Sequence, residues 1–316
     1  MATFGWVTDI TNGVMLNHAL SKKLRFASIA KTKFVGFTRV EPGFGRKRGQ
    51  SITIQRIRNI AVPTSAVIAE GQRIPVDQFL ISTTSITPQQ IARSVEYTDL
   101  VEQLNNYDVK NPIQFKLRQQ MALVLDNLAS DAFKEAKIKF IPTSLAGGTF
   151  DTDGTPSTQA TANISIDHCG VIRDYLSDTI HTDAFEDDKY VGLGSTKLLR
   201  GIKNDPAFQV WRRYLQPGDV LYNSEVGAVE SIRWIEVNNT AALSNAKGAA
   251  SILGEGVVFG PDAVAMAEVV SPHLRVAIPG NYGLDKGVAW YGNLGFGPVW
   301  DTANDGEANI IHITSS

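Results

Sequence analysis

The 316-residue sequence contains a single cysteine, Cys169, which excludes an intrachain disulfide and a zinc site built from several thiolates. No apolar run approaches the ~20 residues of a transmembrane helix. The start, MATFGWVTDITNG, lacks the basic-then-apolar order of a signal peptide. We therefore expect a soluble protein of a reducing compartment. With 43% hydrophobic residues, the chain can bury a substantial core.

Catalytic and ligand-binding motifs are also missing. GLGSTKLL at 192–199 differs from a phosphate-binding loop because threonine, not glycine, precedes its lysine, and its Ser and Thr indicate a helix N-terminus instead. DTDGT at 151–155 lacks the later glutamate of a calcium loop. His168 and Cys169 are adjacent, so on a helix their side chains point apart and cannot act as base and nucleophile. We expect no catalysis, cofactor or metal; the least favoured alternative is a metal hydrolase around Asp151, Asp153 and His168.

Positive charge is concentrated in the first part of the chain. Residues 1–60 hold eleven Lys and Arg against two acidic residues, a net charge of +9. The other 256 residues carry 19 basic and 30 acidic groups, a net charge of −11. Such a chain can attract a copy of itself, and its basic segment also suits nucleic acid. Because the acidic remainder would repel an extended polyanion, contact between copies is favoured.

The basic segment includes the stretch EPGFGRKRGQSITIQRIRNI, residues 41–60. Its QSITIQRIR portion alternates as a strand with one apolar face, and residues 70–88 are typical of a returning strand. Residues 44–85 then form a two-stranded excursion, too short of apolar side chains for a core and dependent on another surface. One candidate acidic patch on an adjacent subunit is DAFEDD, residues 183–188. We predict that the side chains reaching such a patch are Arg46, Lys47, Arg48, Arg56 and Arg58.

The strongest helical signal covers residues 112–138. Asn111 is a good N-cap, Pro112 suits the first turn, and apolar residues recur at spacings of four and three. At 1.5 Å per residue this predicts a helix of roughly 40 Å that could span a domain. The residues expected in its core are Ile113, Leu117, Met121, Val124 and Leu128.

The remaining chain mixes helices and strands, which indicates the α+β class. Helices are predicted at 165–180 and from 195 to a point before Pro206, with the buried strand KYVGLG between them. Strand patterns then follow between Gly, Pro and Asn turns. They lie at 229–239, 254–270, 273–279, 286–300 and 309–316.

The order of these elements resembles that of the major capsid proteins of tailed double-stranded-DNA bacteriophages. The stretches that carry the resemblance are GRKRGQSITIQRI with EGQRIPV, NPIQFKLRQQMALVLDNLASDAF, KYVGLGSTKLLRGIKNDPAF, GAVESIRWIEVNN, GVVFGPDAVAMAE and KGVAWYGNLGFGPVW. The resemblance implies an α+β fold whose parts follow one another along the chain. They are an N-terminal arm (1–40), an extended loop (41–85), a peripheral domain with a spine helix (86–140), an axial domain (141–270) and closing strands returning to the peripheral domain (271–316).

The resemblance also implies a structural role without catalysis. Pentamers and hexamers of the chain would tile an icosahedral capsid around packaged double-stranded DNA, which the shell contacts non-specifically. The implied partners are other copies of the chain, a separate scaffolding protein and a portal, with a decoration protein left open and no membrane. The place of action is the virion, assembled in the host bacterial cytoplasm. We do not predict a crosslink at Lys47, the only lysine of the loop.

Two alternatives stay open. One is an encapsulin-like nanocompartment shell, which shares this fold but encloses enzymes. The other is a DNA-binding protein that uses the basic residues 20–58.

Overall fold

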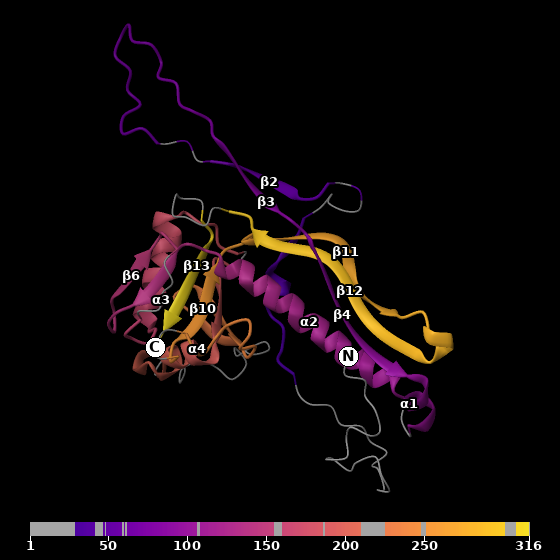
Figure 1. Ribbon diagram of the computed structural model, residues 1–316. Helices are drawn as coiled ribbons and strands as arrows, with labels where there is room; N and C mark the ends of the chain where they lie inside the picture. The colour runs from indigo at the N-terminus through magenta and orange to yellow at the C-terminus, as the bar shows by residue number, and fades with distance from the viewer. Residues whose placement is uncertain are drawn as a thin grey trace.

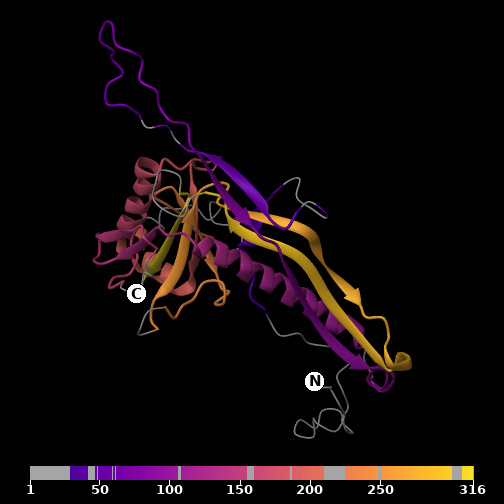
Figure 2. The ribbon, with the colours of Figure 1, turned by 45° about the horizontal axis from the view of Figure 1, so that its top comes forward.

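The computed structural model describes residues 29–41, 47, 49–58, 60, 62–105, 108–154, 160–185, 187–209, 225–247, 251–300 and 308–315. Figures 1 and 2 show a compact part built on one sheet, an elongated part built on another, and a long loop projecting from near their junction. The long helix α2 lies along the elongated part and ends at the compact part.

The elongated part contains a four-stranded sheet of order β1-β11-β12-β4. β1 pairs parallel with β11, and the other neighbours are antiparallel. Two helices and two short 3₁₀ turns accompany this sheet. Their bounds and those of the strands are β1 Arg39–Val40, β4 Gln89–Thr98, β11 Val264–Val276, β12 Asp285–Pro298, α1 Asp99–Leu104, α2 Lys110–Lys134, η1 Val35–Phe37 and η3 Asn281–Gly283.

The predicted long helix is present as α2, with shifted ends. It begins two residues before the predicted 112 and ends four residues before the predicted 138. Asn111 lies inside the helix and is not its N-cap, because the backbone N–H of Lys110 already bonds to Asp108 Oδ1 at 3.1 Å. At the other end, Lys139 Nζ donates to the carbonyl of Lys134 at 3.1 Å, satisfying one of the last helical acceptors.

The buried face of α2 changes along its length. Leu117 is 3% exposed and belongs to a cluster with Tyr97, Val288 and Trp290. Three more of the predicted residues, which are partly buried, pack against this cluster: Ile113, Met121 and Val124. Leu128 is only half-buried and lies outside the described clusters, so its assignment to the core was wrong.

The physical reason is a change of packing partner. Beyond residue 125, α2 packs in a second cluster that adds residues of the seven-stranded sheet to those of β11 and β12, so a different face of the helix is covered. The residues buried there are Asp126, Ala129, Ser130, Ala132 and Phe133.

The compact part contains a seven-stranded sheet of order β6-β5-β13-β10-β7-β9-β8. The helices α3 and α4 and a π-helical turn, η2, belong to this part. The bounds are β5 Lys139–Pro142, β6 Gly148–Asp151, α3 Ile166–Asp174, η2 Tyr175–Thr179, β7 Tyr190–Ser195, α4 Thr196–Asn204, β8 Glu225–Val229, β9 Ile232–Val237, β10 Gly254–Phe259 and β13 Ile310–Ser315.

Both faces of this sheet are buried. Neighbouring residues of β10 point to opposite sides, so Val258 joins the core under α3 and α4 while Val257 joins the core that includes Phe133 of α2. Gly192 in β7 allows the Trp234 ring to pack, since a Cβ there would come within 2.7 Å of that ring. The β7 strand was expected to be buried, and all six of its residues are.

The predicted grouping of the closing strands differs from the observed pairing. Residues 271–316 were expected to return together to the peripheral domain. β12 does pair with β4 in the four-stranded sheet, but β13 lies between β5 and β10 in the other sheet. The bound at 270 also falls inside β11. Strand patterns alone carry no information about which sheet a strand enters, and the predicted domain bounds stay a prediction.

Candidate assembly surface

The extended loop, taken as the described residues of 41–85, is anchored at its base. Its strands β2 (Ile52–Ile57) and β3 (Ile81–Ile86) pair antiparallel along their whole length. Ile52, Ile54 and Ile86 pack with Ala265 and Ala267 of β11. The base of the loop is thus held on the four-stranded sheet.

Beyond β2 the loop projects away from the molecule (Figure 1). Every described residue from 60 to 81 is exposed. Nine large apolar side chains in this stretch are between 43% and 93% exposed. They are Ile60, Val62, Val67, Ile68, Ile74, Val76, Phe79, Leu80 and Ile81.

This distribution corrects the expectation that the loop is short of apolar side chains. The side chains are present, but its own chain offers them no surface to pack on. Burying one such side chain contributes about 1.5–3 kcal/mol, so burying all nine is worth on the order of 10 kcal/mol per copy before ordering costs. Exposed apolar surface of this extent marks an interaction site.

A tight turn closes the loop at its tip. The Gln72 N–H donates to the Ala69 carbonyl at 3.1 Å, and Gly71 has φ of +82°. A type II turn requires positive φ at its third residue, which glycine adopts without strain. The turn reverses the chain direction between the two limbs of the loop, residues 60–68 and 73–81.

The five basic residues predicted to contact a neighbour are placed differently. Lys47 is exposed, and Arg58 is half-buried, with its backbone N–H bonded to the Leu80 carbonyl at 3.0 Å. Arg46 and Arg48 lie outside the described residues. An intersubunit role for these four stays a prediction.

Arg56 differs from Lys47 and Arg58 because its side chain is buried. It is 8% exposed, on the same inward face of β2 as Ile52 and Ile54, because alternate residues of a strand share a face. Within the described part of the chain, its Nε and Nη1 atoms have no hydrogen-bond partner. A guanidinium enclosed by its own chain cannot reach an acidic group of another copy, so this assignment is corrected.

The predicted acidic patch lies on the compact part. Asp183, Asp187 and Asp188 are exposed, and Glu186 is outside the described residues. Asp183 and Ile57 of β2 line one pocket of about 280 Å³. The patch is therefore close to the base of its own loop and remains a candidate partner for another copy.

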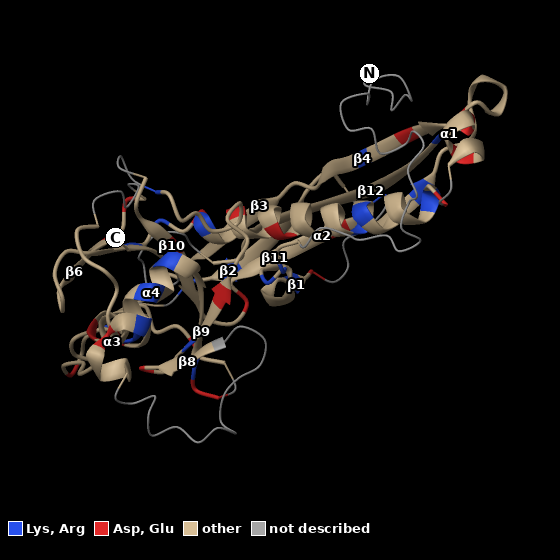
Figure 3. Cartoon of the chain, turned by 90° about the horizontal axis from the view of Figure 1, so that it is seen from below, with Lys and Arg blue, Asp and Glu red and all other residues tan. Residues whose placement is uncertain are grey.

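Sequence reasoning missed a second exposed apolar surface, at the far end of the elongated part. Lys286 Nζ stiffens this end by pairing with Asp99 at 2.6 Å and Glu102 at 2.8 Å. Figure 3 shows the acidic residues of α1 here, beside basic residues of α2. A signal was present in the sequence, since Tyr282 and Leu284 are large apolar residues between the strands predicted at 273–279 and 286–300. The exposed apolar residues are Leu100, Leu104, Ile278, Tyr282 and Leu284.

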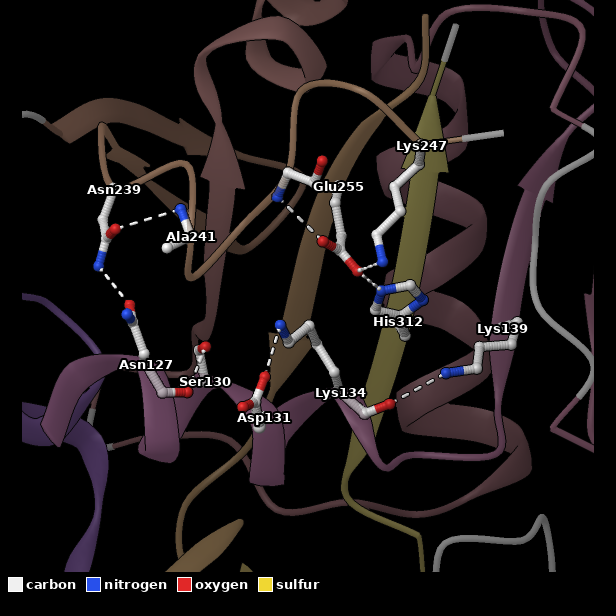
Figure 4. Close-up of polar contacts among 11 residues, drawn as sticks. Asn127, Ser130, Asp131, Lys134, Lys139, Asn239, Ala241, Lys247, Glu255 and His312 are labelled. Carbon is white, nitrogen blue, oxygen red and sulfur yellow. Dashed lines mark hydrogen bonds and ion pairs between the residues drawn. The ribbon is translucent and has the colours of Figure 1, made fainter. Parts of the chain in front are cut away.

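A buried polar cluster joins the central strands of the seven-stranded sheet (Figure 4). Glu255 of β10 is 2% exposed and accepts hydrogen bonds from His312 Nε2 at 2.8 Å and from the Ser244 N–H at 3.0 Å. Lys247 Nζ lies 3.5 Å from the same carboxylate. Burial raises the pKa of Glu255, but the hydrogen bonds and positive charges around it outweigh burial and hold the pKa at about 2.

His312 in this cluster favours the neutral form. Burial lowers the pKa of His312. The hydrogen bond to Glu255 raises it, but the positive charges of Lys139 and Lys247 also lower it, and the net shift is downward. Its Nδ1 has no hydrogen-bond partner among the described residues, so a proton there would be left unsatisfied. The cluster therefore joins β10 to β13 and to the segment that contains Ser244 and Lys247.

The motifs set aside in the sequence have structural roles. Ser195 caps α4 by accepting the Leu198 N–H at 3.4 Å. His168 Nδ1 accepts the Ser165 N–H at 3.0 Å at the start of α3, and burial raises the pKa of Cys169 to about 12. Asp151 accepts the Asp153 N–H within a turn. In the described ranges, no group of His, Cys, Asp and Glu could hold a metal ion.

The search for membrane-spanning helices gives a negative result for the part of the chain that the structure describes. No helix there is both long enough and apolar enough to cross a bilayer.

Comparison with known proteins gives matches at the level of structure alone. No protein-family model and no curated protein matches the sequence. Among solved structures, the capsid of Helicobacter pylori bacteriophage KHP30 matches with TM-score 0.69 and 12% identity, covering 97% of both chains. The capsid of cyanophage Pam1 matches with TM-score 0.69 and 15% identity over 100% of this chain and 99% of that chain. The capsid of Ralstonia phage GP4 matches with TM-score 0.67 and 13% identity, covering 95% of each chain. The chain therefore has the tailed-phage capsid fold.

Proposed function

We propose that the chain is the major capsid protein of a tailed bacteriophage and assembles into an icosahedral shell around double-stranded DNA. The single observation that carries the proposal is the projecting loop, whose nine large apolar side chains have no partner surface in the described part of their own chain. A full-length match to phage capsid chains supports a neighbouring copy as the partner.

The mechanism is burial repeated by symmetry. One copy lays its loop on the next, and each such contact joins different surfaces on the two copies. Contacts of this kind form rings when the rotation between copies closes, here as pentamers and hexamers. The loop base stays fixed by β2 and β3, so the position of the limb on its neighbour is defined. We further propose a separate scaffolding protein, a portal and non-specific contact with packaged DNA, with assembly in the host cytoplasm and the virion as final location.

Electron microscopy of the purified protein, alone and with a co-expressed scaffold, tests this proposal. The expected result is closed shells for the wild-type chain. The double variant Val67→Ser/Val76→Ser removes two side chains that are 90% and 85% exposed, so it should leave the subunit folded and prevent shell closure.

A matched control removes exposed apolar side chains elsewhere. Leu145→Ser/Ile252→Ser changes residues that are 84% and 51% exposed on the compact part, and it should assemble like wild type. Normal shells from the loop variant would refute the proposed mechanism. Shells that contain protein cargo and no nuclease-protected DNA would instead identify a nanocompartment. Tight DNA binding by a chain that never forms shells would identify a DNA-binding protein.

A further inference from the structure

An N-terminal strap, residues 29–41, connects the two parts of the molecule. Phe34 is fully buried, with its ring 5.6 Å from that of Phe133 in α2. The Phe37 ring lies 5.5 Å from Phe259 of β10, in the seven-stranded sheet. The strap then ends as β1 in the four-stranded sheet. It therefore contacts α2 and both sheets.

One side chain of α2 fastens the strap at its buried point. Asp126 is completely buried, and its Oδ1 accepts hydrogen bonds from the backbone N–H groups of Lys33 and Phe34, both at 2.8 Å. Its Oδ2 accepts from Asn239 Nδ2 at 3.3 Å. Phe34 is the N-cap of η1 and has no capping side chain of its own. Asp126, from a distant part of the sequence, accepts the two backbone N–H groups that lead into this turn, those of Lys33 and of Phe34 itself.

The exposure of the strap residues changes at Lys33. Lys31 and Thr32 are exposed, whereas Phe34 is buried. An open groove of about 410 Å³ lies between residues 29–33 and the side chains of Gln119, Ala122 and Leu123 on α2. Before Lys33 the strap is held by one exposed hydrogen bond, from the Lys31 N–H to Asn238 Oδ1 at 3.0 Å, so Asp126 is the first buried anchor along the strap.

We propose that Asp126 is a positioning residue that fixes the path of the strap over α2 at Lys33 and Phe34. Its two hydrogen bonds hold successive backbone amides, so they set the direction of the strap as well as its position. The sequence before the anchor includes the basic residues Lys22, Lys23, Arg25 and Lys31. The path of the strap then decides which acidic surfaces these residues can reach. Only this last consequence, contact with a neighbouring copy, rests on the proposed function.

Hydrogen–deuterium exchange on the full, unassembled chain tests the anchor directly. Hydrogen bonds to a carboxylate are strong, so Asp126→Ala should speed exchange in the peptide covering residues 29–37 by about 10-fold or more. Peptides from the first half of α2 and from β10 should be unchanged. Asp126→Asn keeps an oxygen acceptor and should exchange close to wild type. The control Asp131→Ala, at a 66% exposed site on the same helix, removes only an ion pair to Lys134 and should change nothing in the strap.

Unchanged strap exchange in Asp126→Ala would overturn the inference. Uniformly faster exchange across the protein would also overturn it, since Asp126 would then be a general stability residue. An Asp126→Asn variant as fast as Asp126→Ala would refute the acceptor role. The two claims are tested by different measurements. A wild-type chain that forms no shells in microscopy would count against the proposed function, but it would not affect the exchange result on Asp126.

Discussion

The packing of α2 on the four-stranded sheet predicts a large difference between two leucines of one helix. Leu117 is 3% exposed in the cluster with Tyr97 and Trp290, and Leu128 is half-buried outside it. Leu117→Ala removes three carbons from a closed site, which costs the lost transfer free energy plus a cavity term, about 3 kcal/mol in total. At the half-buried Leu128 the site is open to solvent, so Leu128→Ala should cost about 1 kcal/mol.

Thermal unfolding followed by calorimetry measures this difference. For a chain of this size, a loss of 1 kcal/mol lowers the melting temperature by about 2 °C, so we expect shifts of about 6 °C and about 2 °C. Trp290 lies in the same cluster and donates to Gln120 Oε1 at 3.3 Å, so its fluorescence should report the same transition. Equal destabilisation by the two variants would show that the helix is buried uniformly and would refute the change of face described above.

Three other predictions follow from charged residues. Since the folded-state pKa of Glu255 is about 2 and that of His312 is below its usual 6.5, the unfolded chain binds more protons in acid, and the melting temperature should fall as the pH drops through 6.5 and again from 4.5 toward 2. If the melting temperature of Glu255→Gln fell below pH 4.5 as steeply as that of the wild type, Glu255 would not be the group that causes the acid-dependent loss of stability. Arg56→Met should leave the stability of the subunit unchanged or raise it, because Arg56 is buried and two of its guanidinium nitrogens have no hydrogen-bond partner among the described residues. Shell assembly should be unaffected, and impaired assembly would show that Arg56 contributes to the interface. Reversing the charge of Arg46, Lys47 and Arg48 should leave the subunit folded and weaken assembly. Added salt should weaken the same contact in the wild-type chain, as turbidity and microscopy would show. That variant is Arg46→Glu/Lys47→Glu/Arg48→Glu, and normal assembly combined with lost DNA affinity would favour nucleic-acid binding instead.

Local signals predicted local structure well. The spacing of apolar residues gave the α2 helix, and the Ser195 hydroxyl caps α4 where the sequence indicated a helix start. The strands β2 and β3 pair as their alternation predicted. Each of these features depends on residues close together in the chain, so a pattern within one segment contains the needed information.

The failures concern partners that lie far apart in the sequence. Leu128 continues the spacing of the helix, but it belongs neither to the cluster around Leu117 nor to the one around Phe133. Arg56 looked like part of a basic surface because charge was counted along the segment, while strand alternation turns it inward. Asp126 was not singled out, since its partners are backbone amides 92 and 93 residues away. The nine apolar residues of the loop are spread among polar ones over 22 positions, so no periodic apolar face marked them in the sequence.

The position of β13 has a consequence for synthesis. A ribosome makes this strand after every other strand of the seven-stranded sheet, yet β13 sits inside the sheet between β5 and β10. Until Ile310–Ser315 has emerged, both neighbours present unpaired edges, and Ile311 and Ile313 are missing from the core under α3 and α4. The compact part therefore closes only after almost the entire described chain has been translated, and a polypeptide that ends before β13 cannot complete the core of this part.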